Sequence, residues 1–408
     1  MDSVIIIGGG AAGMTAAIAA AMCGDRVTVL ERMDRVGKKI LATGNGRCNL
    51  MNTGELRYPG GNDFAQQVLA RMGAREQQAF WETLGLRLRQ EDGGRVYPVS
   101  NAASSVLDTL RQTMRLLNVD VVTEVEADGL SQSRKGWLVT AGDRRWTAQR
   151  VIVAGGGCAQ PKLGSNGSAW PLLTGLGHKM ARPEPALTQI ITDTAPIRGL
   201  SGIRVRCGVC VTEGKREKYR ESGELLFADY GVSGVCVMQC ARFAAPGDIF
   251  HIDLTRAMGL NGAKELRKEL DRRFNSWAGS PQMTKLDLLT GLCVPKLAIA
   301  LMRGAGIEKP QEQPASSVAP AQLDRLAQLA ADFCLTVKGV KGFDSAQVTA
   351  GGVRTDAFDP ATLASRLAPG VHAAGEVLDV DGDCGGYNLM FAFGSGLLAG
   401  LNGRPHPW

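Results

Sequence analysis

The chain has 408 residues, with 46 Lys and Arg against 40 Asp and Glu, which gives a formal net charge of +6. This length predicts two or three domains, and the small positive charge permits an anionic partner without requiring one. No apolar run approaches the ~20 residues that a membrane-spanning helix needs, so we expect a soluble, cytoplasmic protein. The 10 cysteines are scattered, and we expect them to be reduced.

The first predicted unit is a strand, a glycine turn and a helix. Residues 4–7 form a β-branched run typical of a strand buried on both faces, and residues 8–13 follow it as G-x-G-x-x-G. The next residues predict a helix over 14–22 and a second strand over 27–30. This order is that of a mononucleotide-binding fold, in which the glycine turn and the helix start hold a pyrophosphate.

Single residues of this unit have separate roles. Gly8 permits the tight turn, Gly10 lets the backbone approach a pyrophosphate, and Gly13 lets helix and strand pack closely. Glu31 lies 18 residues beyond Gly13, where a carboxylate accepts hydrogen bonds from ribose hydroxyls. Arg32 could instead cover a charged face. We favour an adenosine ribose without a 2′-phosphate.

A stretch rich in Gly, Asn and basic residues covers residues 36–52. Its composition predicts a loop rather than a core element, placed where a pyrophosphate would need cover. Lys38 and Arg47 could supply charge to that cover, and a solvated basic loop is the alternative.

The pattern then predicts amphipathic helices over 63–84 and 104–117, and strands over 120–126 and 137–140. Val125 would meet the adenine if its strand passes over the nucleotide.

A second buried strand, residues 151–153, ends in a glycine run. Gln160 and Pro161 stand where the last glycine and the helix of a second fingerprint would be. The chain therefore has one mononucleotide fold of the usual kind, and any nicotinamide nucleotide must bind transiently.

The middle of the chain changes character. Short alternating strands over 187–192, 204–212 and 218–227 predict a small β-domain that extends to about residue 244, and residues 258–329 read as mostly helical. One face of the first helix carries Lys264, Arg267, Lys268 and Arg272. Such a face is either solvated or a phosphate-contacting surface.

Four cysteines of the β-domain resemble a zinc set: Cys207, Cys210, Cys236 and Cys240. However, the first pair lies in a strand-like run, where an odd offset sends the two side chains to opposite faces. We therefore predict no metal site.

Another glycine-rich part of the sequence lies near the C-terminus. A strand ending at Gly375-Glu376 and a helix beginning near Tyr387 would place backbone N–H groups against an electron-rich ring edge. This describes the pyrimidine end of a flavin, whose reduced form a helix N-terminus favours. Asp379, with Asp381 and Asp383, is interpreted as a ribityl or loop contact.

Four stretches together resemble the BaiN/RdsA family of NAD(P)/FAD-dependent oxidoreductases, which includes enzymes of the aminoacetone oxidase type. They are residues 8–13 with Glu31, residues 44–49 (Gly-Asn-Gly-Arg-Cys-Asn), residues 223–227 with 231–234, and residues 375–379 with 385–388. The resemblance implies an α/β fold with a Rossmann-like FAD-binding domain, an inserted β-barrel domain and a nested helical domain. We expect the FAD-binding domain at 1–186 and 341–408, the barrel at 187–257 and 331–340, and the helical domain at 258–330.

The resemblance also implies FAD as cofactor and NAD(P)H as a transient reductant. The expected FAD contacts are Gly8, Gly10, Ala11, Ala12, Gly13, Glu31, Arg32, Lys38, Lys39, Ile40, Gly46, Arg47, Cys48, Asn49, Val125, Ala154, Gly155, Gly156, Gly375, Glu376, Asp379, Gly386, Tyr387, Asn388 and Leu389. The family usually continues its Leu-Phe with Thr-His, whereas this chain has Ala228-Asp229 followed by Tyr230. A role of that histidine would be lost here, or moved to Asp229 or Tyr230.

Reduced flavin can give a hydride to an electron-poor carbon–carbon double bond while a nearby acid protonates the neighbouring carbon. Cys48 is our first candidate for that acid and Tyr387 our second; alternatively, Cys48 only packs under the ring and Tyr387 orients the flavin. The leading substrate is uracil in ribosomal RNA, reduced to dihydrouridine, with the basic helical domain contacting the RNA. The alternatives are a small-molecule ene-reductase of steroid or bile-acid type, an amino-ketone oxidase, and a non-enzymatic flavin-binding protein.

Overall fold

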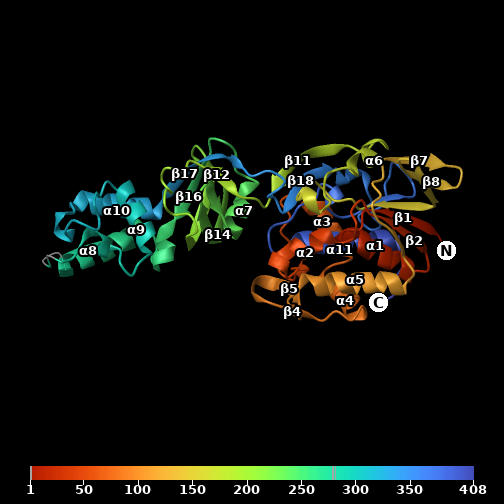
Figure 1. Cartoon of the computed structure of the whole chain (residues 1–408), viewed down its shortest axis with the longest axis horizontal. Coiled ribbons are helices and arrows are strands. Elements are labelled where there is room, and N and C mark those ends of the chain that lie inside the picture. The colour runs from red at the N-terminus through yellow and green to blue at the C-terminus, as the bar shows by residue number, and fades with distance from the viewer. Residues whose placement is uncertain (1, 278–279, 281) are drawn as a thin grey trace. The chain divides into compact units, whose positions relative to one another are not determined.

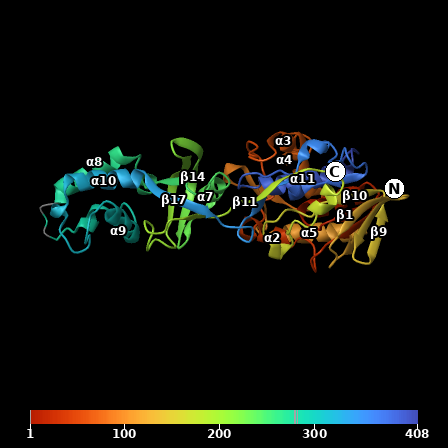
Figure 2. The ribbon, with the colours of Figure 1, turned by 90° about the horizontal axis from the view of Figure 1, so that it is seen from above.

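The computed structural model describes the chain except residues 1, 278, 279 and 281. It divides into two compact units, shown in Figures 1 and 2. The first contains residues 1–185 and 343–408, and the second contains residues 186–342. In the described part of the chain, no helix is both long and apolar enough to cross a membrane.

A five-stranded sheet is the centre of the first unit, in the order β19-β10-β1-β2-β6. Its strands are β1 (Ser3–Ile7), β2 (Arg26–Leu30), β6 (Asp120–Val122), β10 (Arg150–Val153) and β19 (Val371–Ala373), and every neighbouring pair is parallel. Ile7 is in register with both Leu30 and Val153, and Val153 is in register with Ala373. The strands therefore end together, and the glycine-rich segments that follow β1, β10 and β19 meet at one edge.

Two helices from opposite ends of the chain pack together in this unit, namely α1 (Ala11–Met22) and α11 (Tyr387–Leu401). Glycines allow the close approach: a Cβ added to Gly396 would lie 2.3 Å from the Ala12 carbonyl oxygen, and one on Gly400 would lie 2.4 Å from that of Ala16. Figure 2 shows the blue α11 among N-terminal elements such as α3 and α4. The unit is thus built from both ends of the chain.

The remaining elements of the first unit surround this core. The helices are α2 (Lys38–Ala42), α3 (Asn62–Leu69), α4 (Ala74–Thr83), α5 (Ala103–Leu116) and α6 (Trp170–Thr174). Small sheets are formed by β3 (Met51–Asn52), β5 (Arg95–Pro98) and β4 (Leu88–Gln90); by β7 (Gly129–Ser133), β8 (Gly136–Ala141) and β9 (Arg144–Ala148); and by β11 (Met180–Ala186) with β18 (Val348–Val353).

The structure corrects the predictions of one helix over 63–84 and one loop over 36–52. The helix predicted over 63–84 is two helices, α3 and α4, because Gly73 caps α4 in an extended conformation. A Cβ on Gly73 would lie 2.7 Å from the Leu69 carbonyl oxygen. The loop predicted over 36–52 contains the helix α2 and the strand β3, and it buries Ile40 and Leu50 in the core.

Two predicted strands are also shorter than expected. The strand predicted over 120–126 ends at Val122, because Glu124 has φ +55° and turns the chain. Its backbone N–H then donates to the Met33 carbonyl. The strand predicted over 187–192 keeps only β12 (Ile190–Thr192), since Leu187 has φ +48° and separates it from β11.

The second unit is a closed six-stranded barrel with helices inserted into it. The barrel order is β12-β15-β14-β13-β16-β17. Its strands are β12, β13 (Arg204–Glu213), β14 (Arg216–Ala228), β15 (Gly231–Ser233), β16 (Ile249–Asp253) and β17 (Phe333–Val340), all antiparallel, with α7 (Val235–Ala241) between β15 and β16. The predicted fold class, a Rossmann-type parallel sheet with an inserted β-barrel, is confirmed.

Helices α8 (Ala263–Trp277), α9 (Pro295–Gly304) and α10 (Pro320–Ala331) lie in sequence between β16 and β17. They share one hydrophobic core with the barrel, in which Phe250 and Ile252 of β16 belong to the same cluster as Leu266 and Leu270 of α8. The finer division into a barrel domain and a helical domain, with the boundaries given above, remains a prediction.

Candidate flavin-binding site

The glycine turn after β1 is packed tightly on two sides and open on a third. A Cβ on Gly8, which has φ +103°, would lie 2.5 Å from the Ala154 carbonyl oxygen, and one on Gly13 would lie 1.8 Å from the Gly8 oxygen. A Cβ on Gly10 would meet nothing within 4 Å. Gly8 and Gly13 therefore serve packing, whereas Gly10 faces the space through which a pyrophosphate would approach.

Helix α1 begins at this turn with its N–H groups directed at that space. Gly10 is its N-cap and has no side chain to occupy them, and the first turn, Ala11 to Met14, contains no acid. Helix α11 begins in the same way, with Gly386 as N-cap followed by Tyr387, Asn388 and Leu389. Two helix N-termini are thus available to negatively charged parts of a ligand.

Glu31 supports the glycine turn from the end of β2. Its Oε2 accepts a hydrogen bond of 2.8 Å from the Gly9 N–H, and its Oε1 accepts one of 2.8 Å from the Met33 N–H. The Val125 N–H donates to the Glu31 carbonyl at 2.9 Å, so the predicted adenine neighbour lies beside the predicted ribose ligand. Each carboxylate oxygen has two lone pairs, so ribose hydroxyls can bond to it as well.

The predicted basic cover has defined partners. Lys38 Nζ lies 2.5 Å from Asp34 Oδ1, and Lys39 Nζ lies 2.8 Å from Glu376 Oε2. The second pair joins α2 to the C-terminal Gly-Glu motif. Arg32 Nη1 donates to the Gly164 carbonyl at 3.2 Å.

Arg47 is directed towards the β4–β5 hairpin. Its guanidinium carbon lies 4.0 Å from the centroid of the Tyr97 ring, its Nη2 lies 2.5 Å from Glu91 Oε1, and its Nε donates to Asn101. The expectation that Arg47 supplies charge to the pyrophosphate therefore stays a prediction.

The segment carrying Cys48 and Asn49 lies against the start of α11. A Cβ on Gly386 would lie 2.5 Å from the Met51 carbonyl oxygen and 2.8 Å from Asn49 Oδ1. Two motifs more than 300 residues apart, Gly-Arg-Cys-Asn and Gly-Gly-Tyr-Asn, thus come together. Sequence reasoning missed Asn52, whose Nδ2 donates to the Gly385 carbonyl at 2.9 Å and so ties the two motifs.

Cys48 is strained and enclosed. It has φ +57° and is 0% exposed, and burial raises the pKa of its thiol to about 12 despite an opposing hydrogen bond from Thr43. The thiol is therefore fully protonated at neutral pH, as a proton donor must be. Its proton is also held far more strongly than in an ordinary cysteine.

Tyr387 is held by an aromatic neighbour that sequence reasoning missed. The Tyr58 ring lies 5.9 Å from that of Tyr387, edge on, and the Tyr58 hydroxyl donates to the Tyr387 carbonyl at 2.7 Å. Burial raises the pKa of the Tyr387 hydroxyl, and Arg57 nearby opposes this. The Asn388 side chain bonds both the N–H and the carbonyl of Gly382 at 2.8 Å, so it shapes the loop before α11.

The glycine runs after β10 and β19 complete the cradle. A Cβ on Gly155 would lie 2.4 Å from that of Ala169, and one on Gly375 would lie 2.8 Å from that of Ala12 at the start of α1. Thr349, which carried no sequence signal, accepts hydrogen bonds at its Oγ1 from Cys158 and Ala159, at 2.8 and 3.0 Å. The backbone N–H of Thr349 donates to Glu376 Oε1 at 2.8 Å.

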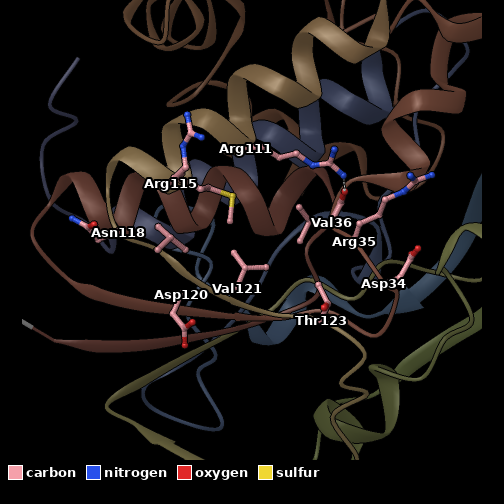
Figure 3. Close-up of a pocket in the computed structure, with 11 residues that line it drawn as sticks. Asp34, Arg35, Val36, Arg111, Arg115, Asn118, Asp120, Val121 and Thr123 are labelled. Atoms are coloured by element: carbon pink, nitrogen blue, oxygen red, sulfur yellow. Dashed lines mark hydrogen bonds between the residues drawn. The ribbon is translucent and has the colours of Figure 1, made fainter.

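A separate pocket of about 690 Å³ lies beside β6 and α5 (Figure 3). Its lining residues are Asp34, Arg35, Val36, Arg111, Met114, Arg115, Asn118, Val119, Asp120, Val121 and Thr123, and the predicted FAD contacts are not in this set. Arg111 Nη2 donates to the Val36 carbonyl at 2.6 Å. A Cβ on Gly9 would lie 2.4 Å from Val36 Cγ1, so Arg111 supports the residue that covers the glycine turn.

The replaced family motif lies in the second unit. Strand β14 ends at Ala228, and Asp229 and Tyr230 form the turn into β15. Lys341 Nζ lies 3.7 Å from the centroid of the Tyr230 ring. Whether either residue replaces the family histidine remains a prediction.

The cysteines of the barrel divide as their spacing predicted. Cys207 belongs to the hydrophobic core together with Cys236 and Cys240 of α7, whereas Cys210 is outside that cluster. Alternation along β13 therefore separates Cys207 from Cys210.

A parallel sheet with glycine turns at its carboxyl edge, two uncapped helix starts and an acid at the end of β2 defines a dinucleotide-binding oxidoreductase of the flavoprotein class. The cradle fits FAD, because Gly10 leaves the approach to the α1 N-terminus open and Glu31 stands where the ribose would lie. The model of the HI0933-like protein Rossmann domain family matches residues 2–402, and the chain belongs to this family. This confirms the predicted membership of the BaiN/RdsA group and makes the chain an FAD-dependent oxidoreductase.

Among curated proteins, the chain is 39% identical to 3-dehydro-bile acid delta(4,6)-reductase of Clostridium scindens, covering 100% of both chains. It is 26% identical to ribosomal RNA dihydrouridine synthase of Haemophilus influenzae, covering 98% of this chain and 97% of that protein. Among solved structures, 3-ketosteroid-delta4-(5alpha)-dehydrogenase of Rhodococcus jostii RHA1 aligns with a TM-score of 0.50 at 16% identity, over 99% of this chain and 97% of that chain. This last likeness shows a shared fold.

Proposed function

We propose that the protein is an NAD(P)H-linked ene-reductase that acts on a small alicyclic molecule, of steroid or bile-acid type, with a carbon–carbon double bond conjugated to a carbonyl. The observation that carries this proposal is the full-length 39% identity to a bile-acid reductase, against 26% to a ribosomal RNA dihydrouridine synthase. This choice departs from the substrate that the sequence first suggested, which was uracil in ribosomal RNA.

The charges of α8 also favour a small substrate over RNA. Arg267 pairs with Asp271 at 3.0 Å and with Asp324 of α10. Arg272 and Arg273 both pair with Glu269, at 2.8 and 2.7 Å. Lys264 and Lys268 remain exposed, but a helix face whose arginines are already paired with acids attracts phosphates less strongly than one with unpaired arginines.

The chemistry that FAD supplies when bound is the transfer of a hydride from a nicotinamide to an electron-poor double bond. The N-termini of α1 and α11, with Glu31, would bind and orient it. A protein acid must then protonate the carbon next to the one that receives the hydride.

We rank Tyr387 ahead of Cys48 as that acid. General acids work best when their pKa lies near the working pH, but burial raises the pKa of both groups, that of Cys48 to about 12, so the ranking rests on position. Cys48 is fully buried, whereas Tyr387, 6% exposed, begins the helix whose N-terminus would face the flavin. Cys48 then has a packing role beneath the cradle.

The experiment is anaerobic reduction of the FAD-loaded protein by NADH or NADPH, followed by rapid mixing with a 3-keto-4-ene steroid or with unmodified ribosomal RNA. We expect fast flavin reoxidation by the enone at a rate independent of salt, and none by RNA. Fast reoxidation by RNA that falls steeply with salt would contradict the proposal. Reduction of the oxidised flavin by an amino ketone, with reoxidation by oxygen alone, would indicate an oxidase.

The proton donor is tested by two matched hydroxyl deletions. Tyr387→Phe should slow enone-driven reoxidation by about 100-fold to 10,000-fold, the usual contribution of a general acid. Tyr58→Phe removes the hydroxyl that donates to the Tyr387 carbonyl but leaves the acid itself in place, so it should slow the reaction much less than Tyr387→Phe does. If Cys48→Ser is slow and Tyr387→Phe is fast, the ranking of the two acids is wrong.

A further inference from the structure

We propose that the outer face of the barrel binds one transition-metal ion of the zinc class, held by His251, Asp332 and Cys334. One potential ligand atom from each residue lies within 4.8 Å of the others. The three residues belong to the neighbouring strands β16 and β17 and to the residue that precedes β17.

The backbone register puts these side chains together. His251 of β16 is directly opposite Cys334 of β17 in the antiparallel pair. Phe250, Ile252, Phe333 and Leu335 alternate with them and lie in the barrel core. His251 and Cys334 therefore both point outward from the barrel, because side chains alternate along a strand.

The distances suit a site that closes with a small movement. His251 Nδ1 lies 2.7 Å from Asp332 Oδ1 and 3.4 Å from Cys334 Sγ. With metal–ligand bonds of about 2.0–2.3 Å, tetrahedral ligand atoms stand about 3.3–3.8 Å apart. The Asp332 carboxylate must move outward by about 0.6 Å to reach this spacing. Its side chain is 60% exposed, so solvent surrounds it on the side towards which it moves.

A neighbouring residue fixes the imidazole in the orientation that a metal requires. The Oγ1 atom of Thr212, on β13, lies 2.9 Å from His251 Nε2 and forms a hydrogen bond with it. This bond holds the far side of the ring and leaves Nδ1 facing the carboxylate and the thiol. Such an outer partner of a metal-binding histidine is a regular part of protein metal sites.

The donor set selects the kind of ion. One imidazole nitrogen, one thiolate and one carboxylate favour zinc or a similar borderline ion over Mg²⁺ or Ca²⁺, which prefer oxygen ligands alone. Three protein ligands leave the fourth position to water. The site is distinct from the cysteines Cys207, Cys236 and Cys240, which lie in the barrel core.

The position of the site suggests its effect. Strand β16 leads out of the barrel into the helical insertion α8–α10, and Asp332 and Cys334 flank the first residue of the returning strand β17. A bound ion would join the outgoing and returning strands at the base of this insertion. It would therefore stabilise the second unit.

The test is a cobalt titration of the FAD-loaded full chain, because tetrahedral Co²⁺ absorbs in the red, where oxidised flavin does not. We expect one equivalent to give this absorption and zinc to displace it. Cys334→Ser and His251→Gln should abolish it, and Thr212→Val should weaken binding about 10-fold to 100-fold. The control Cys293→Ser changes a thiol of the same unit that is partly buried and lies outside the proposed site, and it should bind as the parent does.

Thermal unfolding gives a second measurement. Saturating zinc should raise the midpoint of the parent and of Cys293→Ser, and leave Cys334→Ser and Asp332→Asn unchanged. These two side chains are exposed, so the variants should fold and retain FAD. Absence of the cobalt absorption in the parent, or its persistence in Cys334→Ser and His251→Gln, would overturn the proposal.

Discussion

The substitution Gly10→Ala should weaken FAD binding without destabilising the fold of the first unit. Gly10 has φ −80° and ψ −164°, an extended conformation that alanine adopts readily, and the added Cβ would meet no protein atom within 4 Å. The apoprotein should therefore stay within about 1 kcal/mol of the parent, because the gain of about 0.4–1 kcal/mol from restricting the unfolded chain offsets the preference for glycine over alanine at an N-cap. Urea unfolding of the apoprotein measures this.

The same methyl group would occupy the space in front of the α1 N-terminus, where the pyrophosphate is expected. Displacing the phosphates would weaken one or two hydrogen bonds to a charged group, each contributing about 1.5–3 kcal/mol. Since about 1.4 kcal/mol is a factor of ten in affinity, we expect FAD to bind about 10-fold to 1,000-fold more weakly. The assay is quenching of FAD fluorescence on titration with apoprotein.

Gly342→Ala is the matched control. Its Cβ also meets nothing within 4 Å, and it adds the same methyl group in the second unit, so the affinity for FAD should not change. If Gly10→Ala binds FAD as tightly as the parent does, the pyrophosphate does not lie against this turn. If both variants lose affinity equally, the loss has another cause.

Further predictions concern stability and support of the site. Asp25 is buried between Arg150 and Arg404, at 2.6 and 2.5 Å, so Asp25→Ala should lower the free energy of unfolding by about 3 kcal/mol, measured by urea denaturation. Although burial alone would raise the pKa of Asp25, hydrogen bonds and the two arginines lower it overall. Ionised Asp25 therefore stabilises the fold fully at pH values above its unfolded pKa, ~3.9, and this stabilisation is lost as the pH falls through the lower native pKa. Asp25→Asn should make the free energy of unfolding depend less on pH in this acidic range, and an unchanged dependence would contradict the argument. Arg111→Ala should weaken FAD binding several-fold by releasing Val36 from above the glycine turn, whereas Arg115→Ala, in the same pocket, should not.

The sequence predicted correctly those elements whose conformation depends on residues close to them along the chain. Four β-branched residues before G-x-G-x-x-G could form only a strand and a tight turn, and the Ala-rich segment after them continued as α1. The missed break inside the helix predicted over 63–84 has a local cause as well. Gly73 caps α4, and the sequence carried that signal within an otherwise amphipathic stretch.

The partners of the charged residues were not visible in the sequence. The basic face of α8 suggested a phosphate-binding surface, yet Arg267 finds Asp324 on another helix, 57 residues away. In the same way, the sequence did not show that Arg47 pairs with Glu91 and Asn101. Spacing along one helix or loop cannot reveal a counter-charge contributed by another element.

The sequence by itself determined the nucleotide-binding strand, turn and helix, the family motifs and the fold class, because these depend on periodicity, glycine positions and short-range spacing. Only the tertiary structure decided which motifs meet: it placed Gly386 against Met51, and His251 opposite Cys334. Parallel register and barrel closure bring together residues that are tens to hundreds of positions apart. No short-range pattern encodes such pairings, since they result from burying apolar strand faces in a common core.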